Sequence, residues 1–395
     1  MKILISVEQA ISLVLKNVNP CSKTEIIDLE YALGYVLAEP VMAPINLPPF
    51  RQAAMDGYAV NYQGNSDFKV VGEVKAGDAQ SPLLEAGQCV RIFTGAQVPD
   101  TANVVIKQEA IIRIDSSISV EEEIKLGSNI RPEGEQIKKT TVALGKGATL
   151  NTSAIGLLAS LGLTSVTVFK KPTVGIVVTG NELVSGGQPL KTGQIYESNA
   201  VMLNSALASL GIFQVEMLRV ADNFQDTALI LSQALDRYDF TLVSGGISVG
   251  DYDFVGPALN AIGVTQVFYK VKQKPGQPIF FGKKGDNFVF ALPGNPASSL
   301  SCFYIYVTLA IEQFSHKPYS AVKKDKRVVE NSFTKTGSRA HFLKACIKEE
   351  AVEILDGQAS SMLHSFALAN ALVYLPEEVD SVKPGDIVTV WHLPN

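Results

Sequence analysis

The pattern of apolar and polar positions predicts helices in three places within the first half of the chain. Ser6 and Gln9 form a capping box at the start of an apolar stretch that ends before Asn19, which predicts a first helix. A second helix is expected over residues 29–37 and a third near residues 152–161. The second and third would flank a region of different pattern.

The region that starts at Asn46 has the pattern of short strands. Pro48 and Pro49 are followed by β-rich pieces that glycine and proline interrupt. Strands are predicted at residues 69–74, 88–93 and 103–108. This region is therefore predicted to be a small all-β unit.

After residue 172 the pattern becomes an alternation of strands and helices. Strands are predicted at residues 174–178, 215–220, 240–244, 267–271 and 287–292, and helices at 198–210, 226–235, 254–262 and 297–314. Connections of this length imply mostly parallel strands, and hence an α/β domain. From about residue 319, strands at 327–331, 342–349, 371–375 and 387–391 indicate a second small β unit.

The composition is that of a globular protein, and it argues against several functional classes for this chain. A length of 395 residues, 46% of them hydrophobic, suggests two or three domains. The net charge of -5 gives no electrostatic reason to bind nucleic acid or an anionic membrane surface. No run reaches the ~18 apolar residues of a membrane span. Four cysteines without CxxC spacing and four scattered histidines indicate reduced thiols in a cytoplasmic protein without a zinc site.

Three glycine-bearing loops each follow a predicted strand of the α/β domain, at residues 179–183, 244–251 and 293–298. The carboxyl ends of parallel strands share one edge of a sheet, so these loops should converge on one crevice. Glycines let the backbone approach a ligand and point N–H groups at an anion. Asn295 as N-cap, with Pro296 at the first helical position, would add a helix N-terminus. A phosphate-bearing ligand fits such a crevice.

Any one of these loops would by itself more often be an ordinary turn. The three together, with carboxylates at Glu182, Asp251 and Asp253, favour a ligand site. Carboxylates beside phosphate usually hold Mg²⁺, because bare anions repel. Lys270 and Lys274 would balance the remaining negative charge, although a single lysine is more often a solvated surface group.

Residues 246–250 also match G-x-S-x-G, the nucleophile elbow of α/β-hydrolases, with Ser248 as the nucleophile. The base would have to be one of the histidines, and nothing in the sequence marks one of them: His316, His341, His364 and His392. The pattern arises easily by chance, so the hydrolase is the weaker hypothesis. The standard nucleotide loops GxxxxGK[ST] and GxGxxG do not occur.

A turn outside the α/β domain carries a further acid. Asp56 is followed by glycine within residues 54–59, a pair typical of a β-turn. The apolar neighbours Met55 and Tyr58 predict a partly buried Asp56 carboxylate. Such a carboxylate is costly to keep unless it has a function.

Six segments in collinear order, at residues 49–59, 91–96, 193–196, 244–251, 274–276 and 292–296, resemble the motifs of one family. This is the molybdopterin molybdenumtransferase family, MoeA, whose eukaryotic relatives include the E domain of gephyrin. The resemblance implies an enzyme that takes molybdate and adenylated molybdopterin, releases AMP with the aid of Mg²⁺, and leaves molybdenum on the dithiolene sulfurs. A dianionic oxyanion and a pyrophosphate-linked pterin need cations and N–H donors, which agrees with the loops.

The resemblance also implies a multidomain α/β plus β fold of four parts. These are a discontinuous helical and extended domain (1–49 and 140–169), a small β domain (50–139), a MogA-like three-layer α/β domain with a parallel-rich sheet (170–318) and a C-terminal β-barrel (319–395). It implies a homodimer with the active site between the α/β part of one chain and the β part of the other. A MogA-like adenylyltransferase and molybdoenzyme apoproteins are the implied partners.

Matched position by position, the resemblance implies roles for individual residues. The implied catalytic residues are Asp56, Thr94, Glu182, Asp222 and Asp253, with Glu182 and Asp253 as metal ligands. The implied substrate-binding residues are Gly245, Gly246, Ser248, Gly250, Lys270, Lys274, Pro293, Gly294, Asn295, Pro296 and Ser365.

Three amides stand where the family pattern has charges. Gln136 and Asn181 replace acids, and Gln277 replaces the second lysine of Lys-Pro-Gly-Lys-Pro. An amide keeps hydrogen bonding but cannot neutralise a metal. A catalytically weakened homologue that binds molybdopterin or acts as a scaffold is therefore the second hypothesis. No residue selects between molybdate and tungstate.

Overall fold

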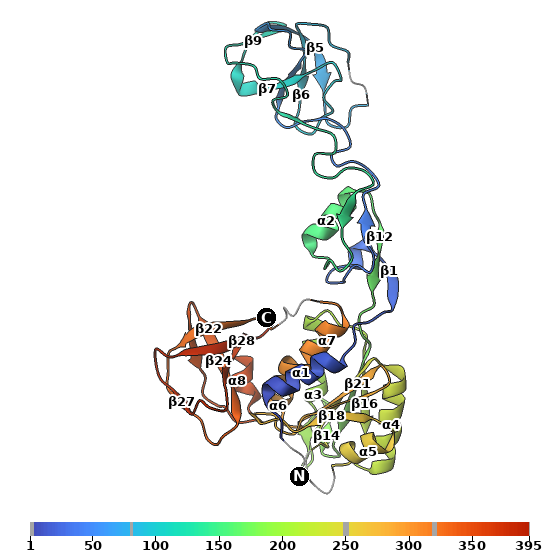
Figure 1. Cartoon of the computed structure of the whole chain (residues 1–395), viewed down its shortest axis with the longest axis vertical. Helices are drawn as coiled ribbons and strands as arrows, with labels where there is room; N and C mark the ends of the chain where they lie inside the picture. Colours follow the sequence, from blue (N-terminus) through green and yellow to red (C-terminus); the bar gives the residue numbers. More distant parts are fainter. Residues whose placement is uncertain (1–3, 80–81, 248–252, 318–321, 395) are drawn as a thin grey trace. The chain divides into compact units, whose positions relative to one another are not determined.

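The computed structural model describes residues 4–79, 82–247, 253–317 and 322–394, and the chain forms two compact units (Figure 1). The first unit contains the chain up to Glu25 and from Phe169 onward, and the second is Ile26–Val168. The chain passes from one to the other through β1 (Thr24–Asp28) and β12 (Ser165–Phe169), which pair in a two-stranded sheet.

The first unit is built on a six-stranded sheet with the order β16-β13-β17-β21-β20-β18. Neighbours among β16, β13, β17 and β21 are parallel, whereas β20 is antiparallel to both β21 and β18. The prediction of a parallel-rich sheet is confirmed, but β20 was not predicted. The strands are β13 (Val174–Thr179), β16 (Val215–Val220), β17 (Phe240–Ser244), β18 (Thr265–Tyr269), β20 (Phe280–Lys284) and β21 (Asn287–Leu292).

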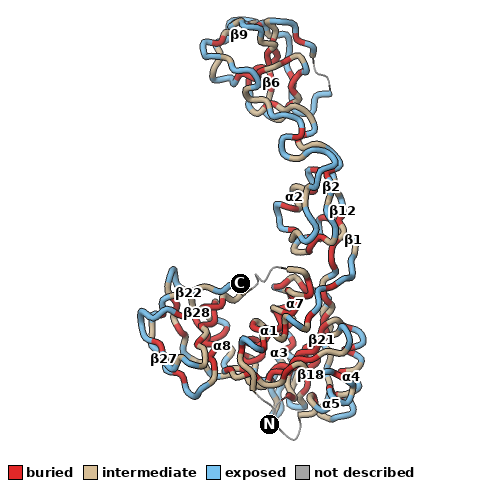
Figure 2. The backbone as a smooth tube through the Cα atoms, viewed as in Figure 1, coloured by how far each residue is buried: buried red, intermediate tan, exposed pale blue. Residues whose placement is uncertain are grey.

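Helices cover both faces of this sheet, which gives three layers. Ile176 and Val178 of β13 belong to one core, with residues of α1, α3 and the α6–α7 region, whereas Val177 belongs to a second core with α4 and α5. Buried residues therefore concentrate in the sheet (Figure 2). The helices are α1 (Val7–Asn17), α3 (Asn199–Ser209), α4 (Phe224–Arg237), α5 (Val255–Ala261), α6 (Pro296–Cys302), the π-helical turn η3 (Phe303–Val307) and α7 (Thr308–Phe314).

The two predictions near the start of the chain had different outcomes. The capping box of α1 is confirmed, because the Gln9 N–H donates to Ser6 Oγ at 3.2 Å and the Ser6 N–H donates to Gln9 Oε1 at 2.9 Å. The helix expected over residues 29–37 is wrong: only the 3₁₀ turn η1 (Leu29–Tyr31) forms. Gly34 has a φ of 73°, and its N–H donates to the carbonyl of Leu150 at 2.8 Å, so the backbone bonds to another segment instead.

The second unit contains the expected small β structure, a six-stranded sheet with the order β7-β4-β6-β5-β9-β8. Gly57 starts β4 where the backbone of β7 comes close: an added Cβ would lie 1.8 Å from the Ile106 carbonyl oxygen. The elements are β2 (Val41–Met42), β3 (Gln52–Ala53), β4 (Gly57–Val60), β5 (Asp67–Val74), β6 (Gln88–Ile92), β7 (Val104–Lys107), η2 (Gln108–Ala110), β8 (Ile111–Ile114), β9 (Ser117–Val120), β10 (Ile130–Arg131), β11 (Val142–Leu144) and α2 (Thr152–Ser160).

The C-terminal part of the first unit is a closed five-stranded barrel, as the resemblance implies. The strands follow one another in the order β24-β25-β22-β28-β26, and β26 pairs back with β24. The strand β25 was not predicted. The elements are β22 (Lys324–Val329), β23 (Phe333–Thr334), β24 (Ala340–Lys348), β25 (Ala351–Ile354), α8 (Leu363–Ala367), β26 (Ala371–Leu375), β27 (Ser381–Val382) and β28 (Ile387–His392).

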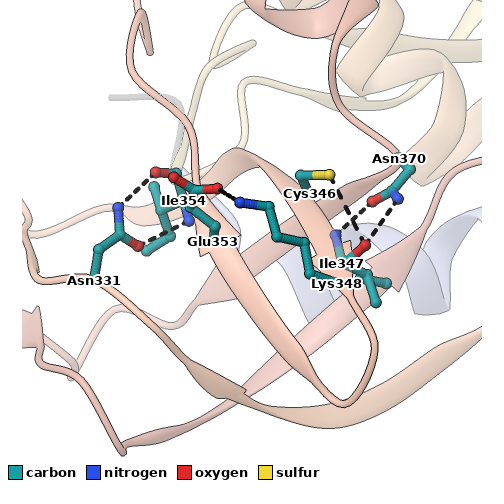
Figure 3. Close-up of polar contacts among 7 residues, drawn as sticks. All are labelled: Asn331, Cys346, Ile347, Lys348, Glu353, Ile354 and Asn370. Carbon is teal, nitrogen blue, oxygen red and sulfur yellow. Dashed lines mark hydrogen bonds and ion pairs between the residues drawn. The ribbon is translucent and has the colours of Figure 1, made fainter.

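Two asparagines extend the hydrogen bonding of the barrel strands through their side chains (Figure 3). Asn331 donates to the Ile354 carbonyl at 2.7 Å and accepts from the Ile354 N–H at 2.9 Å. Asn370 does the same at Ile347, accepting from its N–H at 2.7 Å and donating to its carbonyl at 3.2 Å. Each amide thus satisfies both backbone groups of one residue.

The four cysteines are unpaired, and Cys89 and Cys302 are each 0% exposed in different units. Burial raises the pKa of the Cys89 thiol to about 12 and also raises that of Cys302. Within the described ranges, no helix has the length and apolar character to cross a membrane. The division into four parts at residues 49, 139, 169 and 318 stays a prediction.

Candidate active site

A crevice of about 630 Å³ lies at the carboxyl ends of β13, β17 and β21. Its wall includes Thr179 at the end of β13 and Gly180 directly after it, Gly245 after β17 and Gly294 after β21. The three glycine-bearing loops therefore converge on one site, as their positions after parallel strands predict.

Asn199, at the start of α3, ties two of these loops together. Its Nδ2 donates to Ser244 Oγ and to the Gly294 carbonyl, both at 2.8 Å. Gly245 and Gly246 have φ values of 93° and 60°, and an added Cβ on either would come within 3.0–3.1 Å of Thr179 Oγ1. The loop needs glycine at both positions, for the backbone conformation and for space.

Three of the predicted acids line the crevice: Glu182, Asp222 and Asp253. Asp222 and Asn181 brace each other, because the Asn181 N–H donates to Asp222 Oδ2 at 2.9 Å and the Asp222 N–H donates to Asn181 Oδ1 at 3.4 Å. Among the described residues, no three His, Cys, Asp or Glu side chains form a metal site by themselves. Mg²⁺ normally takes only one or two carboxylates together with substrate phosphates, so these acids fit that ion.

The predicted glycine, proline and asparagine residues of the third loop also lie in the crevice wall: Pro293, Gly294, Asn295 and Pro296. Asn295 is the N-cap of α6 and Pro296 its first residue, as expected. The side chain of Asn295 does not cap the helix; its Nδ2 instead donates to Ser360 Oγ at 3.0 Å.

The two predicted lysines lie on the segment that follows β18 and are not part of the crevice wall. Lys270 has a φ of 69°, with its Nζ 5.0 Å from the centre of the Tyr269 ring. Lys274 is exposed, and its Nζ donates to Thr336 Oγ1 at 3.4 Å. Arg339, which the sequence did not single out, donates from Nη1 to Gln277 Oε1 at 2.6 Å. An arginine thus approaches the position at which the family pattern has a second lysine.

A buried amide fixes this segment. Gln273 is 0% exposed, and its Nε2 donates to the Pro275 carbonyl at 2.9 Å, while its Oε1 accepts from the hydroxyl of Tyr306. Gly276 passes so close to Cys302 that an added Cβ would lie 2.3 Å from Sγ. The backbone on both sides of Lys274 is therefore held by the core of the first unit.

The C-terminal part contributes a serine to the crevice, but a different one from that expected. Ser365 is buried and donates to the Gly357 carbonyl at 2.6 Å, whereas Ser361 lines the crevice. The loop at residues 357–362, which carries Ser361, is held by Lys344, which is 3% exposed and donates to the carbonyls of Gly357, Ala359 and Met362. Burial lowers the pKa of the Lys344 ammonium group.

The Asp56 turn belongs to the second unit, and its carboxylate is exposed, not partly buried as predicted. The residue lies in a bend before β4, and the side chain of Tyr58 turns into the core while that of Asp56 faces solvent. Asp56 Oδ1 accepts from the N–H and from the hydroxyl of Thr94, both at 2.7 Å. These bonds, with a smaller contribution from Arg91, lower the pKa of Asp56.

The remaining predicted residues, Ser248 and Gly250, and the neighbouring Asp251 lie outside the described residues. The hydrolase alternative requires a histidine in the crevice. All four histidines are described, and none is part of the crevice wall. His316, for example, stacks on Phe169 with ring centres 3.7 Å apart, and His392 pairs with Asp325 at 3.1 Å.

The fold and the crevice define a class of multidomain proteins built on an α/β domain that binds its ligand at the carboxyl ends of parallel strands. Three family models match successive parts of the chain. The MoeA N-terminal region (domain I and II) matches residues 5–162, the probable molybdopterin binding domain 175–313 and the MoeA C-terminal region (domain IV) 326–393. The chain belongs to the MoeA family of molybdopterin molybdenumtransferases, which confirms the resemblance.

Relatives match along nearly the whole chain. Molybdopterin molybdenumtransferase of Haemophilus influenzae is 32% identical over 98% of this chain and 98% of its own. Molybdopterin molybdenumtransferase 2 of Mycobacterium tuberculosis is 32% identical over 93% of this chain and 94% of its own. The crystal structure of a molybdopterin biosynthesis moeA protein from Pyrococcus horikoshii OT3 matches with a TM-score of 0.84 and 28% identity, covering 99% of this chain and 100% of that one.

Proposed function

We propose that this chain is a molybdopterin molybdenumtransferase that takes molybdate and adenylated molybdopterin and releases AMP, in molybdenum cofactor biosynthesis. The observation that carries the proposal is the crevice, where three glycine-bearing loops and the carboxylates of Glu182, Asp222 and Asp253 surround one volume of about 630 Å³. Family membership along the whole chain supports the same activity.

The crevice residues would have two roles: the glycine-bearing loops would bind the phosphates, and the carboxylates would bind Mg²⁺. The glycines after β17 and β21 leave room for phosphate oxygens to approach the backbone, where N–H groups favour anions. Glu182 and Asp253 would hold Mg²⁺, and Asp222 lies in the wall of the same crevice. Bound Mg²⁺ supplies positive charge to the phosphate oxygens as AMP departs. Positioning and electrostatics would provide most of the rate enhancement.

The segment after β18 would bind the oxyanion. Lys274 and Arg339 bring positive charge to this segment, and Lys270 lies at its start. The anion would be held by charge and hydrogen bonds, which suit any tetrahedral dianion of this size. Molybdate and tungstate are therefore both expected to bind.

The protein would act as a homodimer in the cytoplasm, with Asp56 and Thr94 of one chain completing the crevice of the other. Asp56 supports this because its carboxylate is exposed and fixed by two hydrogen bonds from Thr94, which also lower its pKa. A MogA-like adenylyltransferase would supply the adenylated substrate and molybdoenzyme apoproteins would receive the product.

A catalytically weakened homologue that binds molybdopterin or acts as a scaffold is the second candidate. The amides Gln136, Asn181 and Gln277 favour it, since each replaces a charge of the family pattern. Asn181 and Gln277 do have structural partners here, Asp222 and Arg339, which favours retained activity.

An AMP-release assay separates these candidates. Purified protein with adenylated molybdopterin, Mg²⁺ and molybdate should release AMP, and Glu182→Ala should reduce the release at least about a hundredfold, as loss of a catalytic electrostatic group does. Glu350→Ala, which changes an exposed glutamate in the turn between β24 and β25, is the matched control and should keep wild-type activity. Wild-type protein that binds the substrate but releases no AMP would make the scaffold the correct candidate.

The shared site has its own test. Glu182→Ala and Asp56→Ala chains, each inactive alone, should regain about a quarter of wild-type activity when co-expressed, because half of the random dimers would carry one intact site. A site contained within one chain would give no recovery.

A further inference from the structure

Two lysine side chains reach the carboxyl end of α3 from distant segments of the sequence. Lys317, which follows α7, donates from Nζ to the carbonyl of Leu210 at 3.3 Å. Lys171 lies between β12 and β13, and a Cβ added to Gly211 would be 3.2 Å from its Nζ. Leu210 is the C-cap of α3, so both ammonium groups lie beside the same helix end. Nothing in the function proposed above uses this lysine pair.

The lysine pair is more than a helix cap needs. The carboxyl end of a helix attracts cations, and one lysine there would be an ordinary cap. Two ammonium groups at one helix end repel each other. Both Lys171 and Lys317 are also half-buried, which removes water that would stabilise the charged form. These surroundings therefore favour a neutral amine on one of the two.

Lys171 is the more affected of the two. Burial, and next the charge of Lys317, lower the pKa of Lys171 to about 8, although Glu25 acts in the opposite direction. Burial lowers the pKa of Lys317 too, and Glu312 opposes that change. At pH 7.5 a pKa of about 8 leaves roughly a quarter of the amine neutral, against about one molecule in a thousand for an ordinary lysine.

We propose that Lys171 is an acylation site, at which its Nζ reacts with an acyl phosphate. A lysine that is desolvated and lies next to a second cation has the surroundings of a nucleophilic amine. Nζ would attack the acyl carbon, so that an N–C bond forms and the acyl C–O bond breaks. Phosphate would leave with the electron pair of that bond and take the proton that the amine gives up. The product is neutral, so the reaction removes one of two like charges.

The charges around Lys171 favour an anionic acyl donor. Two exposed lysines, Lys23 and Lys170, lie close by, because the Lys170 N–H donates to the Lys23 carbonyl at 3.0 Å. Asp239, 3.8 Å from Lys23 Nζ, offsets one of these charges. Cationic surroundings raise the local concentration of an anion. An acyl phosphate carries its negative charge on the leaving group, so the same lysines would stabilise the departing phosphate.

The experiment measures acetylation of the full-length protein by acetyl phosphate at pH 7.5, by mass spectrometry with fragment ions that distinguish Lys170 from Lys171. Lys170 is exposed and adjacent in sequence, which makes it the internal control. The lower basicity of Lys171 offsets part of its gain in neutral amine, so it should react about tenfold faster than Lys170. The rate at Lys171 should level off above about pH 9, whereas that at Lys170 should keep rising beyond about pH 10.

Two substitutions should move this pH profile in opposite directions. Lys317→Gln removes the second cation but keeps a donor for the Leu210 carbonyl, so the midpoint of the Lys171 profile should move to higher pH. Glu25→Gln removes the opposing anion and should move the midpoint to lower pH. Lys348→Gln changes an exposed lysine in β24 and, as the control, should leave the profile unchanged. Melting temperatures confirm that the variants are folded.

Other results would overturn the proposal. Equal rates at Lys170 and Lys171 in the wild type, or no acetylation at Lys171, would show an ordinary or a shielded lysine. Midpoints that stay in place in both Lys317→Gln and Glu25→Gln would remove the charge relationship on which the site rests. The wild-type comparison needs no variant to fold. The inference goes beyond the proposed function, and AMP release would be present or absent independently of these results.

Discussion

Thr94 holds the Asp56 carboxylate with two hydrogen bonds to the same oxygen, one from its N–H and one from its hydroxyl, each 2.7 Å long. The pair joins the turn before β4 to the segment after β6. Both partners are exposed, so the geometry presents an ionised carboxylate in a fixed orientation to whatever approaches the second unit.

Thr94→Val should raise the pKa of Asp56 toward its ordinary value of 3.8, because the hydroxyl bond is lost while the backbone bond remains. A carboxyl group with a lowered pKa stabilises the fold above its unfolded pKa, and this contribution disappears as the pH falls through the folded value. Carboxyl-carbon NMR titration of Asp56 measures the shift. Thr94→Ser keeps the hydroxyl and is the control; a pKa that is the same in both variants would contradict the role of the side chain.

Gln277→Lys should destabilise the protein by about 1–2 kcal/mol, because it removes the acceptor of a charge-assisted hydrogen bond and puts a second cation beside Arg339. Urea unfolding measures the change. The double variant Gln277→Lys with Arg339→Gln removes the repulsion and should recover much of the loss. If the two substitutions simply add, the residues do not interact.

His341 should make stability depend on pH between 6.5 and 4. The ring is 1% exposed, and burial together with the charges of Lys274, Lys335 and Arg339 lowers its pKa from 6.5 to about 4. Since the neutral form is favoured in the fold, the contribution is complete above pH 6.5 and is lost as the pH falls toward 4. The loss should be roughly 2–3 kcal/mol.

Urea unfolding at pH 7.5 and pH 4.5 tests the role of His341. The wild type should lose more stability than His341→Phe, which cannot be protonated. Carboxylates titrate in the same range in both proteins, so only the difference between the two is assigned to the imidazole. Parallel curves would show that the imidazole keeps a normal pKa.

Lys344→Met should lower the free energy of unfolding by about 2–4 kcal/mol, because three carbonyls lose their donor. The loop that they belong to carries Ser361 into the crevice. We therefore expect weaker substrate binding as well, measured as a rise in KM for adenylated molybdopterin. Lys348→Met in the same strand is the control, since its partner Glu353 is on the surface and such pairs contribute little. Unchanged binding in Lys344→Met would separate the loop from the site.

Elements of the fold that depend mainly on their own residues were predicted well from the sequence. The strands Val215–Val220, Phe240–Ser244 and Asn287–Leu292 have the predicted bounds. Phe240–Ser244 and Asn287–Leu292 are almost wholly buried, as mainly apolar runs between turn residues predict, whereas Val215–Val220 contains Glu216 and Arg219 and is only partly buried. The failed helix at residues 29–37 had apolar spacing that suits a helix, but long-range backbone bonds to Ala148 and Leu150 took its place. Local propensity is a weak guide where another segment competes for the same N–H groups.

In the site, too, features set by the local sequence could be predicted, whereas features that depend on contacts with distant segments could not. The convergence of the three loops could be predicted, because strand order fixes where their ends meet. Arg339, Lys344 and Ser361 could not, since all three belong to the C-terminal part. Arg339 reaches the segment after β18, Ser361 lines the crevice, and Lys344 holds the loop that carries Ser361. The burial of Asp56 was overestimated because apolar neighbours in sequence do not reveal which side of a turn faces solvent.

Each of the two units contains one fully buried thiol, and the rate at which that thiol reacts with a reagent reports how often its unit opens. Cys89 belongs to the second unit and Cys302 to the first, and a thiol reagent can reach either only when its surroundings open. Timed alkylation followed by mass spectrometry of the two peptides would report the opening of both units in one sample. A ligand bound at the crevice should slow the labelling of Cys302, and any slowing at Cys89 would measure how much the same ligand reduces the opening of the second unit.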